Sequence, residues 1–178
     1  QTALSNRNLL INDAMQVNQR GTETSSDGND AVADRFLIFR GGTDARFTLS
    51  TDTDVPAGQG FTKSAKIDVT TADTSFAAGD LIGFRQQIEG KNVQHLKKGT
   101  SNAESLTLSF YIKSSITGTY ILELYDFDNG RQISKSYTVS SANTWEKKTL
   151  TFPGDTTGAF DNDNNRSLLV HWWLGAGS

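Results

Sequence analysis

The chain has 178 residues, with 17 Lys and Arg against 20 Asp and Glu for a net charge of −3, and it contains no Cys. This length fits a single domain, and the lack of Cys excludes disulfides and Cys-based metal or nucleophilic sites. The negative charge argues against a nucleic-acid-binding protein, and no apolar run approaches the roughly 18–20 residues of a membrane-spanning helix.

The first half of the chain predicts short strands separated by turn-forming residues. Two Pro and 16 Gly stand among many Ser, Thr, Asn and Asp, and this composition between short apolar runs is typical of an all-β protein. The predicted strands are residues 8–12, 36–40, 46–53, 63–69 and 81–89. Residues 21–30 are polar throughout and predict a long surface loop, and residues 92–98 predict one helical turn.

The second half is more regular. Residues 105–114 alternate apolar and polar side chains, which predicts a half-buried strand. The remaining predicted strands are residues 119–126, 132–139, 144–152 and 167–174. Short turns join residues 105–114, 119–126, 132–139 and 144–152, which predicts that these four strands form an antiparallel meander. Residues 154–166 predict a second long loop, and about ten strands in all favour a sandwich or barrel.

The last predicted strand carries the most informative side chains. Its alternation assigns one face to Leu168, Val170, Trp172 and Leu174, and the other to Leu169, His171 and Trp173. Because the first set is purely apolar, Trp172 is expected in the core. Trp173 beside His171 is then a candidate binding platform, since an exposed indole ring suits stacking against a sugar. A strand buried on both faces is the alternative.

Other aromatic residues lie on neighbouring predicted strands. Tyr111 and Tyr125 occupy the more polar faces of two strands that are adjacent in sequence. If those strands adjoin, both rings belong to one groove, whereas loop packing is the alternative. Trp145 is expected at the edge of the core.

Catalytic and metal motifs are weak in this chain. His95 and His171 have no nucleophile elbow or zinc-helix signature around them, so we expect no enzyme active site. An EF-hand loop starting at Asp161 is excluded, because it requires Gly at its sixth position and Glu at its twelfth, which are Arg166 and Trp172.

A looser calcium site remains as a weak alternative, and no other cofactor is expected. Its candidate ligands are Asp13, Asp54, Asp161 and Asp163. The competing interpretation is that these residues cap turns through their side chains.

Several segments together resemble one family. Asn-Leu-Leu-Ile-Asn at residues 8–12 is followed by Gln-Arg-Gly-Thr at residues 19–22, which is similar to the start of a domain in tail-fibre-like virion proteins of bacteriophages. Further matching segments, in the same order, are residues 33–36, 87–90, 108–114, 117–120, 143–147 and 150–155. The chain departs from the family pattern at Asp13, usually Gly, and at Asn18, often aromatic.

The resemblance implies an all-β, antiparallel jelly-roll β-sandwich, similar to carbohydrate-binding modules. It also implies an extracellular virion protein of the tail or fibre. The family pattern commonly continues past residue 178 with another strand, and the chain starts at Gln1 rather than Met. We therefore expect one domain, residues 1–178, cut from a longer chain.

Three functions remain open from the sequence. The first is a non-catalytic virion domain that binds host-surface carbohydrate through Trp173, His171, Tyr111 and Tyr125. The second is a purely structural virion subunit, with other virion subunits as partners in a homo-oligomer such as a trimer. The third is an accessory carbohydrate-binding module of a secreted polysaccharide hydrolase. No nucleic-acid partner or membrane insertion is expected in any of them.

Overall fold

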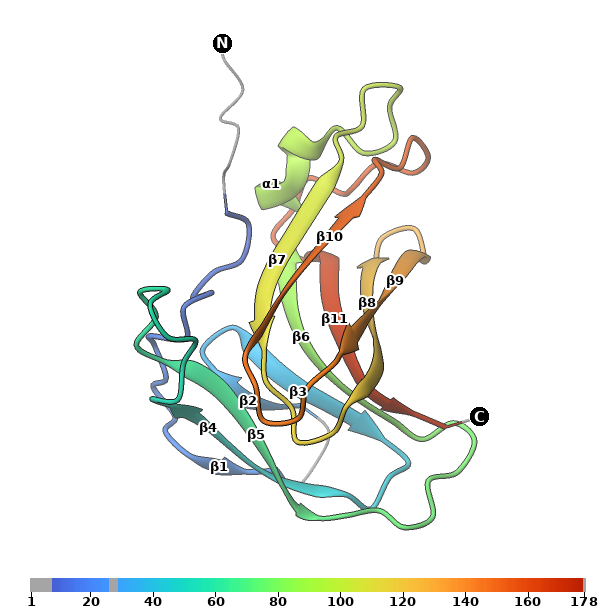
Figure 1. Cartoon of the computed structure of the whole chain (residues 1–178). Helices are drawn as coiled ribbons and strands as arrows, with labels where there is room; N and C mark the ends of the chain where they lie inside the picture. The colour runs from blue at the N-terminus through green and yellow to red at the C-terminus, as the bar shows by residue number, and fades with distance from the viewer. Residues whose placement is uncertain (1–7, 26–28, 178) are drawn as a thin grey trace.

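Eleven strands form two layers in the computed structural model, which describes residues 8–25 and 29–177 (Figure 1). The larger layer is an antiparallel sheet of six strands. In spatial order they are β2 (Asn29–Ala33), β3 (Phe36–Gly41), β6 (Leu81–Glu89), β11 (Arg166–Ala176), β8 (Gly118–Asp126) and β9 (Arg131–Val139). The jelly-roll-like β-sandwich expected from the sequence is therefore confirmed, with eleven described strands in place of about ten.

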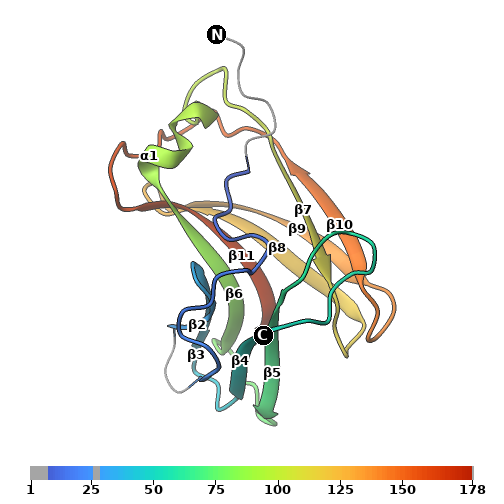
Figure 2. The same cartoon turned by 90° about the vertical axis from the view of Figure 1, so that its left-hand side faces the viewer.

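The second layer consists of two smaller antiparallel sheets. One contains β1 (Glu23–Thr24), β4 (Arg46–Asp52) and β5 (Ser64–Thr71), and the other pairs β7 (Leu106–Ile112) with β10 (Glu146–Phe152). Both small sheets cover the same side of the six-stranded sheet, each at its own end (Figure 2). The opposite side of the large sheet is not covered by any strand of the described chain.

The core lies between the two layers and has two parts. Beneath β7 and β10, Phe36, Leu122 and Trp172 from the large sheet meet Phe152. The second part lies beneath β4 and β5 and includes Ile38, Phe47 and Leu49. Trp172 is only 7% exposed, so the prediction that it belongs to the core is confirmed.

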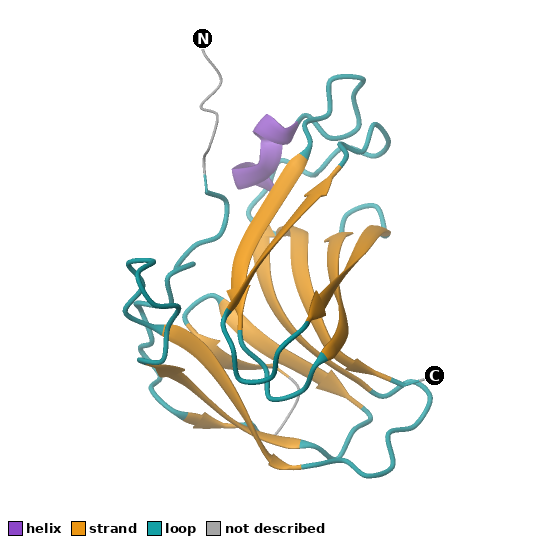
Figure 3. Cartoon of the chain, viewed as in Figure 1, coloured by secondary structure: helices purple, strands orange, loops and turns teal. Residues whose placement is uncertain are grey.

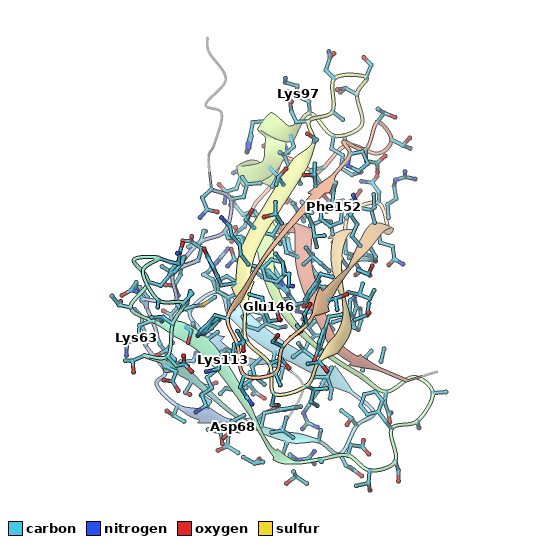
Figure 4. All side chains as sticks on the ribbon, in the orientation of Figure 1. Lys63, Asp68, Lys97, Lys113, Glu146 and Phe152 are labelled. Atoms are coloured by element: carbon cyan, nitrogen blue, oxygen red, sulfur yellow. The ribbon has the colours of Figure 1, made fainter. Side chains whose placement is uncertain are left out.

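The predicted meander is wrong. β7 pairs with β10 and β8 pairs with β9, so the chain changes layer after β7 and again after β9. The two crossing loops are joined where Asn143 N–H donates to Ser114 O at 2.7 Å. Glu146, labelled in Figure 4, accepts from Ser140 and Ser141 N–H, both at 2.8 Å. These contacts stabilise two loops that carry the chain from one layer to the other, where the sequence predicted hairpins within one sheet.

Two predictions in the first half are also wrong. Residues 8–12 contain no strand, and a turn covers residues 11–14. The predicted loop at residues 21–30 contains β1 and the start of β2, and residues 26–28 of it lie outside the described residues. Ser25 is only 1% exposed. The described part of this polar segment is therefore part of the packed sandwich, where β1 and β2 are edge strands of two different sheets.

Loops and one short helix close the end of the sandwich drawn at the top of Figure 3. The predicted helical turn is formed by α1 (Gly90–Val93) and the 3-10 helix Gln94–Leu96. Residues 153–165 contain no strand, as predicted, and Phe160 buries their middle. No helix in the described part of the chain is long and apolar enough to cross a membrane.

The segment before β1 is held to the core by one buried side chain. Gln86 on β6 is fully buried, and its Oε1 accepts from Ile11 N–H at 2.8 Å while its Nε2 donates to Ile11 O at 2.9 Å. Leu9, Leu10 and Met15 pack against the core beside this contact. The turn at residues 11–14 is thus fixed by a residue distant in sequence.

Replacing Gln86 tests this attachment. We expect Gln86→Leu to lower the free energy of unfolding by about 1–3 kcal/mol, because both hydrogen bonds are lost. Gln132→Leu on exposed β9 is the matched control, with an expected change within about 0.5 kcal/mol. Urea denaturation of both variants measures the difference, and equal stabilities would contradict the role of Gln86.

Candidate binding face

The uncovered side of the six-stranded sheet is called the open face below. Cross-strand register places its side chains in rows, since alternate residues of each strand point to the same side. One row contains Leu37, Arg85, His171, Glu123 and Ser134. The next contains Phe39, Gly83, Trp173, Ile121 and Ser136. Gln87, Leu169, Tyr125 and Gln132 form a third row.

Aromatic rings form a continuous series on the open face, called the aromatic line: Trp173, His171, Tyr125 and Phe127. Successive ring centroids are 6.0, 6.3 and 6.3 Å apart. Phe39 flanks the line, 4.9 Å from His171 and 5.4 Å from Trp173. These rings come from β3, β11, β8 and the turn that follows β8, so strand pairing assembles most of the line.

His171 is a buried member of this line. Its Nδ1 lies 3.0 Å from Glu123 Oε1, and both residues are 7% exposed. The Nε2 atom is buried and has no hydrogen-bond partner among the described residues. The carboxylate therefore orients the imidazole, and the ring supports Trp173 and Tyr125, which are both half-buried.

Two arginines pack over rings of the open face. The Arg85 guanidinium carbon lies 4.7 Å from the Phe39 ring centroid, and that of Arg166 lies 3.8 Å from the Phe127 centroid. Burial lowers the pKa of Arg85, and the positive charge of Arg166 lowers it further. The face therefore combines apolar rings with positive charge.

Two adjoining depressions lie where the aromatic line ends at Arg166. The first depression holds about 340 Å³ and is lined by Arg35, Leu37, Gln87, Glu89, Asn164 and Arg166. The second depression holds about 640 Å³ and is lined by Gln87, Phe127, Asp128, Asp161, Asp163, Asn164, Asn165 and Arg166. Strands β3, β6 and β11 form one side of the depressions, and residues 161–165 form the other.

Ion pairs fix the loop that borders these depressions. Lys98 Nζ lies 2.5 Å from Asp126 Oδ2 and 3.2 Å from Asp155 Oδ2, and Arg131 Nε lies 2.7 Å from Asp155 Oδ2. The hydrogen bond from Arg131, and after it those from Thr157 N–H and Lys98, hold the pKa of Asp155 well below its usual range. Residues 153–165 are thus anchored next to β8 and β9.

The structure brings together three of the four predicted binding residues. Trp173, His171 and Tyr125 share the open face, whereas Tyr111 lies on β7 in the other layer. The Tyr111 hydroxyl donates to Gln59 Oε1 at 2.7 Å, and its ring packs against Phe61 at 5.8 Å. The prediction that Tyr111 and Tyr125 share one groove is therefore wrong, because β7 and β8 belong to different sheets.

Sequence reasoning missed four residues of the open face. Arg85 and Gln87 follow the alternation of β6 and could have been assigned to a polar face from that pattern, whereas residues 36–39 of β3 are all apolar and give Phe39 no such signal. Arg166 could not be assigned either, because its place beside Phe127 depends on how the 153–165 loop returns to the sheet.

The four aspartates proposed for calcium do not form one site. Asp54 Oδ2 lies 2.5 Å from Lys113 Nζ and its Oδ1 accepts from Trp145 Nε1 at 2.9 Å (Lys113 is labelled in Figure 4). Lys113, and then Trp145, lower the pKa of Asp54. Asp161 and Asp163 lie in the 153–165 loop, apart from Asp13 before β1. Among residues 8–25 and 29–177, no group of three or more Asp, Glu or His could hold a metal ion.

Comparisons with known proteins relate the chain to two solved structures. No family model and no curated protein matches it. A structure described as "CBM4 structure and function" has a TM-score of 0.52 and 18% identity, covering 94% of this chain and 90% of that one. The enzymatically active domain of tailspike protein 4 from bacteriophage CBA120 has a TM-score of 0.51 and 20% identity.

The tailspike match covers 86% of this chain and 19% of the tailspike chain. This chain therefore spans about a fifth of the tailspike length. At these identities, the two neighbours establish the fold, a β-sandwich of the kind found in a carbohydrate-binding module and in part of a tailspike.

Gly83 is required where Phe39 crosses the open face. A Cβ atom at position 83 would lie 2.3 Å from Phe39 Cζ. We expect Gly83→Ala to displace the ring and destabilise the fold by about 1–3 kcal/mol. Gly41→Ala is the matched control, since its Cβ would meet Leu81 at an ordinary 3.6 Å. Thermal unfolding of both variants measures this, and equal melting temperatures would contradict the packing described.

Proposed function

We propose that this chain is a non-catalytic carbohydrate-binding domain of a phage virion, and that its open face binds a host-surface glycan. The observation that carries the proposal is the aromatic line on an uncovered sheet face, ending in two depressions that are lined by charged and amide side chains. Flat rings stack on the C–H faces of sugars, and the neighbouring amide, carboxylate and guanidinium groups suit sugar hydroxyls.

The arrangement of the site supports this function physically. Trp173, His171 and Tyr125 lie on paired strands, so their spacing is set by the sheet and needs little ordering when a ligand binds. Phe127 extends the line and is 43% exposed. A glycan chain can therefore contact several rings at once.

The proposed setting is the tail or a tail fibre, where the domain also contacts other virion subunits and forms a homo-oligomer such as a trimer. A shallow glycan site gives weak affinity for one copy, and several copies on one particle raise the effective concentration. The sequence resemblance and the tailspike neighbour support this setting.

Glycan binding is tested with an array followed by calorimetry on the best ligand. We expect Trp173→Ala and Tyr125→Ala each to weaken binding about tenfold or more, because each removes a stacked ring. Ile116→Ala, which removes a 69% exposed side chain in the loop between β7 and β8, is the control and should bind as the parent does. Tyr111→Ala should also bind normally.

A different result would favour another function. A stable trimer that binds no glycan would indicate a purely structural virion subunit. If Tyr111→Ala is the one variant that loses binding, the glycan site lies on the other layer, which contains Tyr111.

The proposal also predicts no glycoside hydrolysis. Such hydrolysis generally uses two carboxyl groups beside the scissile bond, whereas Glu123 is engaged by His171 and Glu89 by Arg35 at 2.6 Å. We expect no release of reducing ends from a bound polysaccharide. Release that disappears in Glu123→Gln would show that the domain is an enzyme.

A further inference from the structure

We propose that the ligand is an acidic polysaccharide, and that the first depression binds the carboxylate of one uronic-acid-type sugar through Arg166, Gln87 and Asn164. This inference rests on the proposed function, since it names the class of glycan that the open face takes. Some polar groups around the depressions already have partners, whereas others have none among the described residues.

Most charged groups of the open face are already paired. Arg35 Nη2 lies 2.6 Å from Glu89 Oε1, and Glu123 engages His171. In the part of the chain that the structure describes, the Arg166 guanidinium has neither an ion pair nor a hydrogen bond, and its contact is the Phe127 ring. The first depression therefore has one unneutralised positive charge.

Two uncommitted amides line the same depression. The side chains of Gln87 and Asn164 make no hydrogen bond to any described residue. Each offers an N–H₂ donor, and Arg166 offers a planar fork of donors. Three donor side chains around one unneutralised charge are complementary to a carboxylate.

Arg166 is held ready for such a contact. Its guanidinium carbon lies 3.8 Å from the Phe127 centroid, so one face of the group is covered by the ring. Stacking leaves the N–H edge available, and a planar fork matches a carboxylate with two parallel hydrogen bonds. Arg166 itself is exposed, so a ligand can reach it.

The second depression selects against further negative charge. Asp161 is exposed there, and its carboxylate has no hydrogen bond to a described residue. Asp128 accepts from Asp161 N–H at 2.9 Å, and Asp163 accepts from Asn165 N–H at 2.9 Å. These three carboxylates suit sugar hydroxyls and repel a second acidic group. A glycan with isolated carboxylates fits this site better than a densely sulfated one.

The aromatic line sets the direction of the ligand. Trp173 and Arg166 are seven residues apart on β11, which corresponds to about 23 Å of extended strand. Neutral sugars then stack along the rings, and an acidic sugar occupies the end at Arg166.

The experiment compares three charge states of one backbone. Unsulfated chondroitin oligosaccharides alternate one uronic acid with one neutral amino sugar, and they are prepared as such, with reduced carboxyl groups, and with added sulfate. We expect the unsulfated acid form to bind about tenfold or more tightly than the carboxyl-reduced form. The sulfated form should bind no more tightly than the unsulfated one.

Variants locate the carboxylate. Arg166→Gln should remove the preference for the acid form, so that the acid and reduced forms bind this variant equally, and Gln87→Leu should weaken the preference several-fold. Lys147→Gln is the matched control, because Lys147 also lies over a ring, Tyr111 at 5.8 Å, but in the other layer. Circular dichroism of each variant checks that the fold is kept.

The outcomes separate this inference from the proposed function. Equal binding of the acid and reduced forms, with both lost in Trp173→Ala, would overturn the acidic specificity and retain the glycan-binding site. Tighter binding of the sulfated form would overturn the choice of an isolated carboxylate. No binding to these oligosaccharides or to any glycan on the array would overturn both proposals.

Discussion

One-sided burial of the six-stranded sheet is the constraint on which the rest of the structure depends. Both small sheets pack against the same side, so the large sheet has one side toward the core and one open side. The period of two then couples the proposed binding surface to the core: because Trp172 faces the core, its neighbour Trp173 faces the open side. A register slip of one residue in β11 would exchange the two. Selection for a stable core therefore also fixes which rings reach solvent.

Different interactions hold the two ends of the open face. At the Trp173 end, Phe39 lies over Gly83, and Glu123 orients His171, so the rings are positioned by strands and their direct neighbours. The Arg166 end depends on the 153–165 loop, which ion pairs at Asp155 anchor. The stacking part of the site is thus built into the sheet. The part that we propose sets charge specificity can change with the loop while the sheet is kept.

The sequence predicted local structure better than long-range pairing. β6 was predicted with its observed bounds, and the two faces of β11 were assigned correctly from Leu168 to Trp173, because alternation is a local property. The register shift after Trp173 ends this alternation, and Leu174 does not join the core as predicted. The turns at residues 114–118 and 140–143 carried hairpin signals, yet a reversal of the chain does not say whether the flanking strands pair or separate into two layers. The apolar run at residues 8–12 was wrongly predicted as a strand. The contact that fixes it as a turn joins Ile11 to Gln86, 75 residues away, and a local pattern cannot show such a contact. His171, Trp173 and Tyr125 could be found from the alternation within their own strands. The contribution of Phe39 could not, because it depends on the order in which β3, β6 and β11 pair in the sheet.

The chemistry of the open face favours a hydrated ligand over a protein partner. The centre of a protein interface is usually depleted in charge, and its rings pack into apolar pockets. Here charged groups lie directly against the rings: Arg85 over Phe39, Arg166 over Phe127, and Glu123 on His171. Covering this face with another subunit would remove water from Arg166 and Asp161, neither of which has a partner for its charge among the described residues, and burying unpaired charge is costly. A sugar chain leaves much of this water in place and supplies hydroxyl and carboxylate partners, so the same rings and charges are compatible with it.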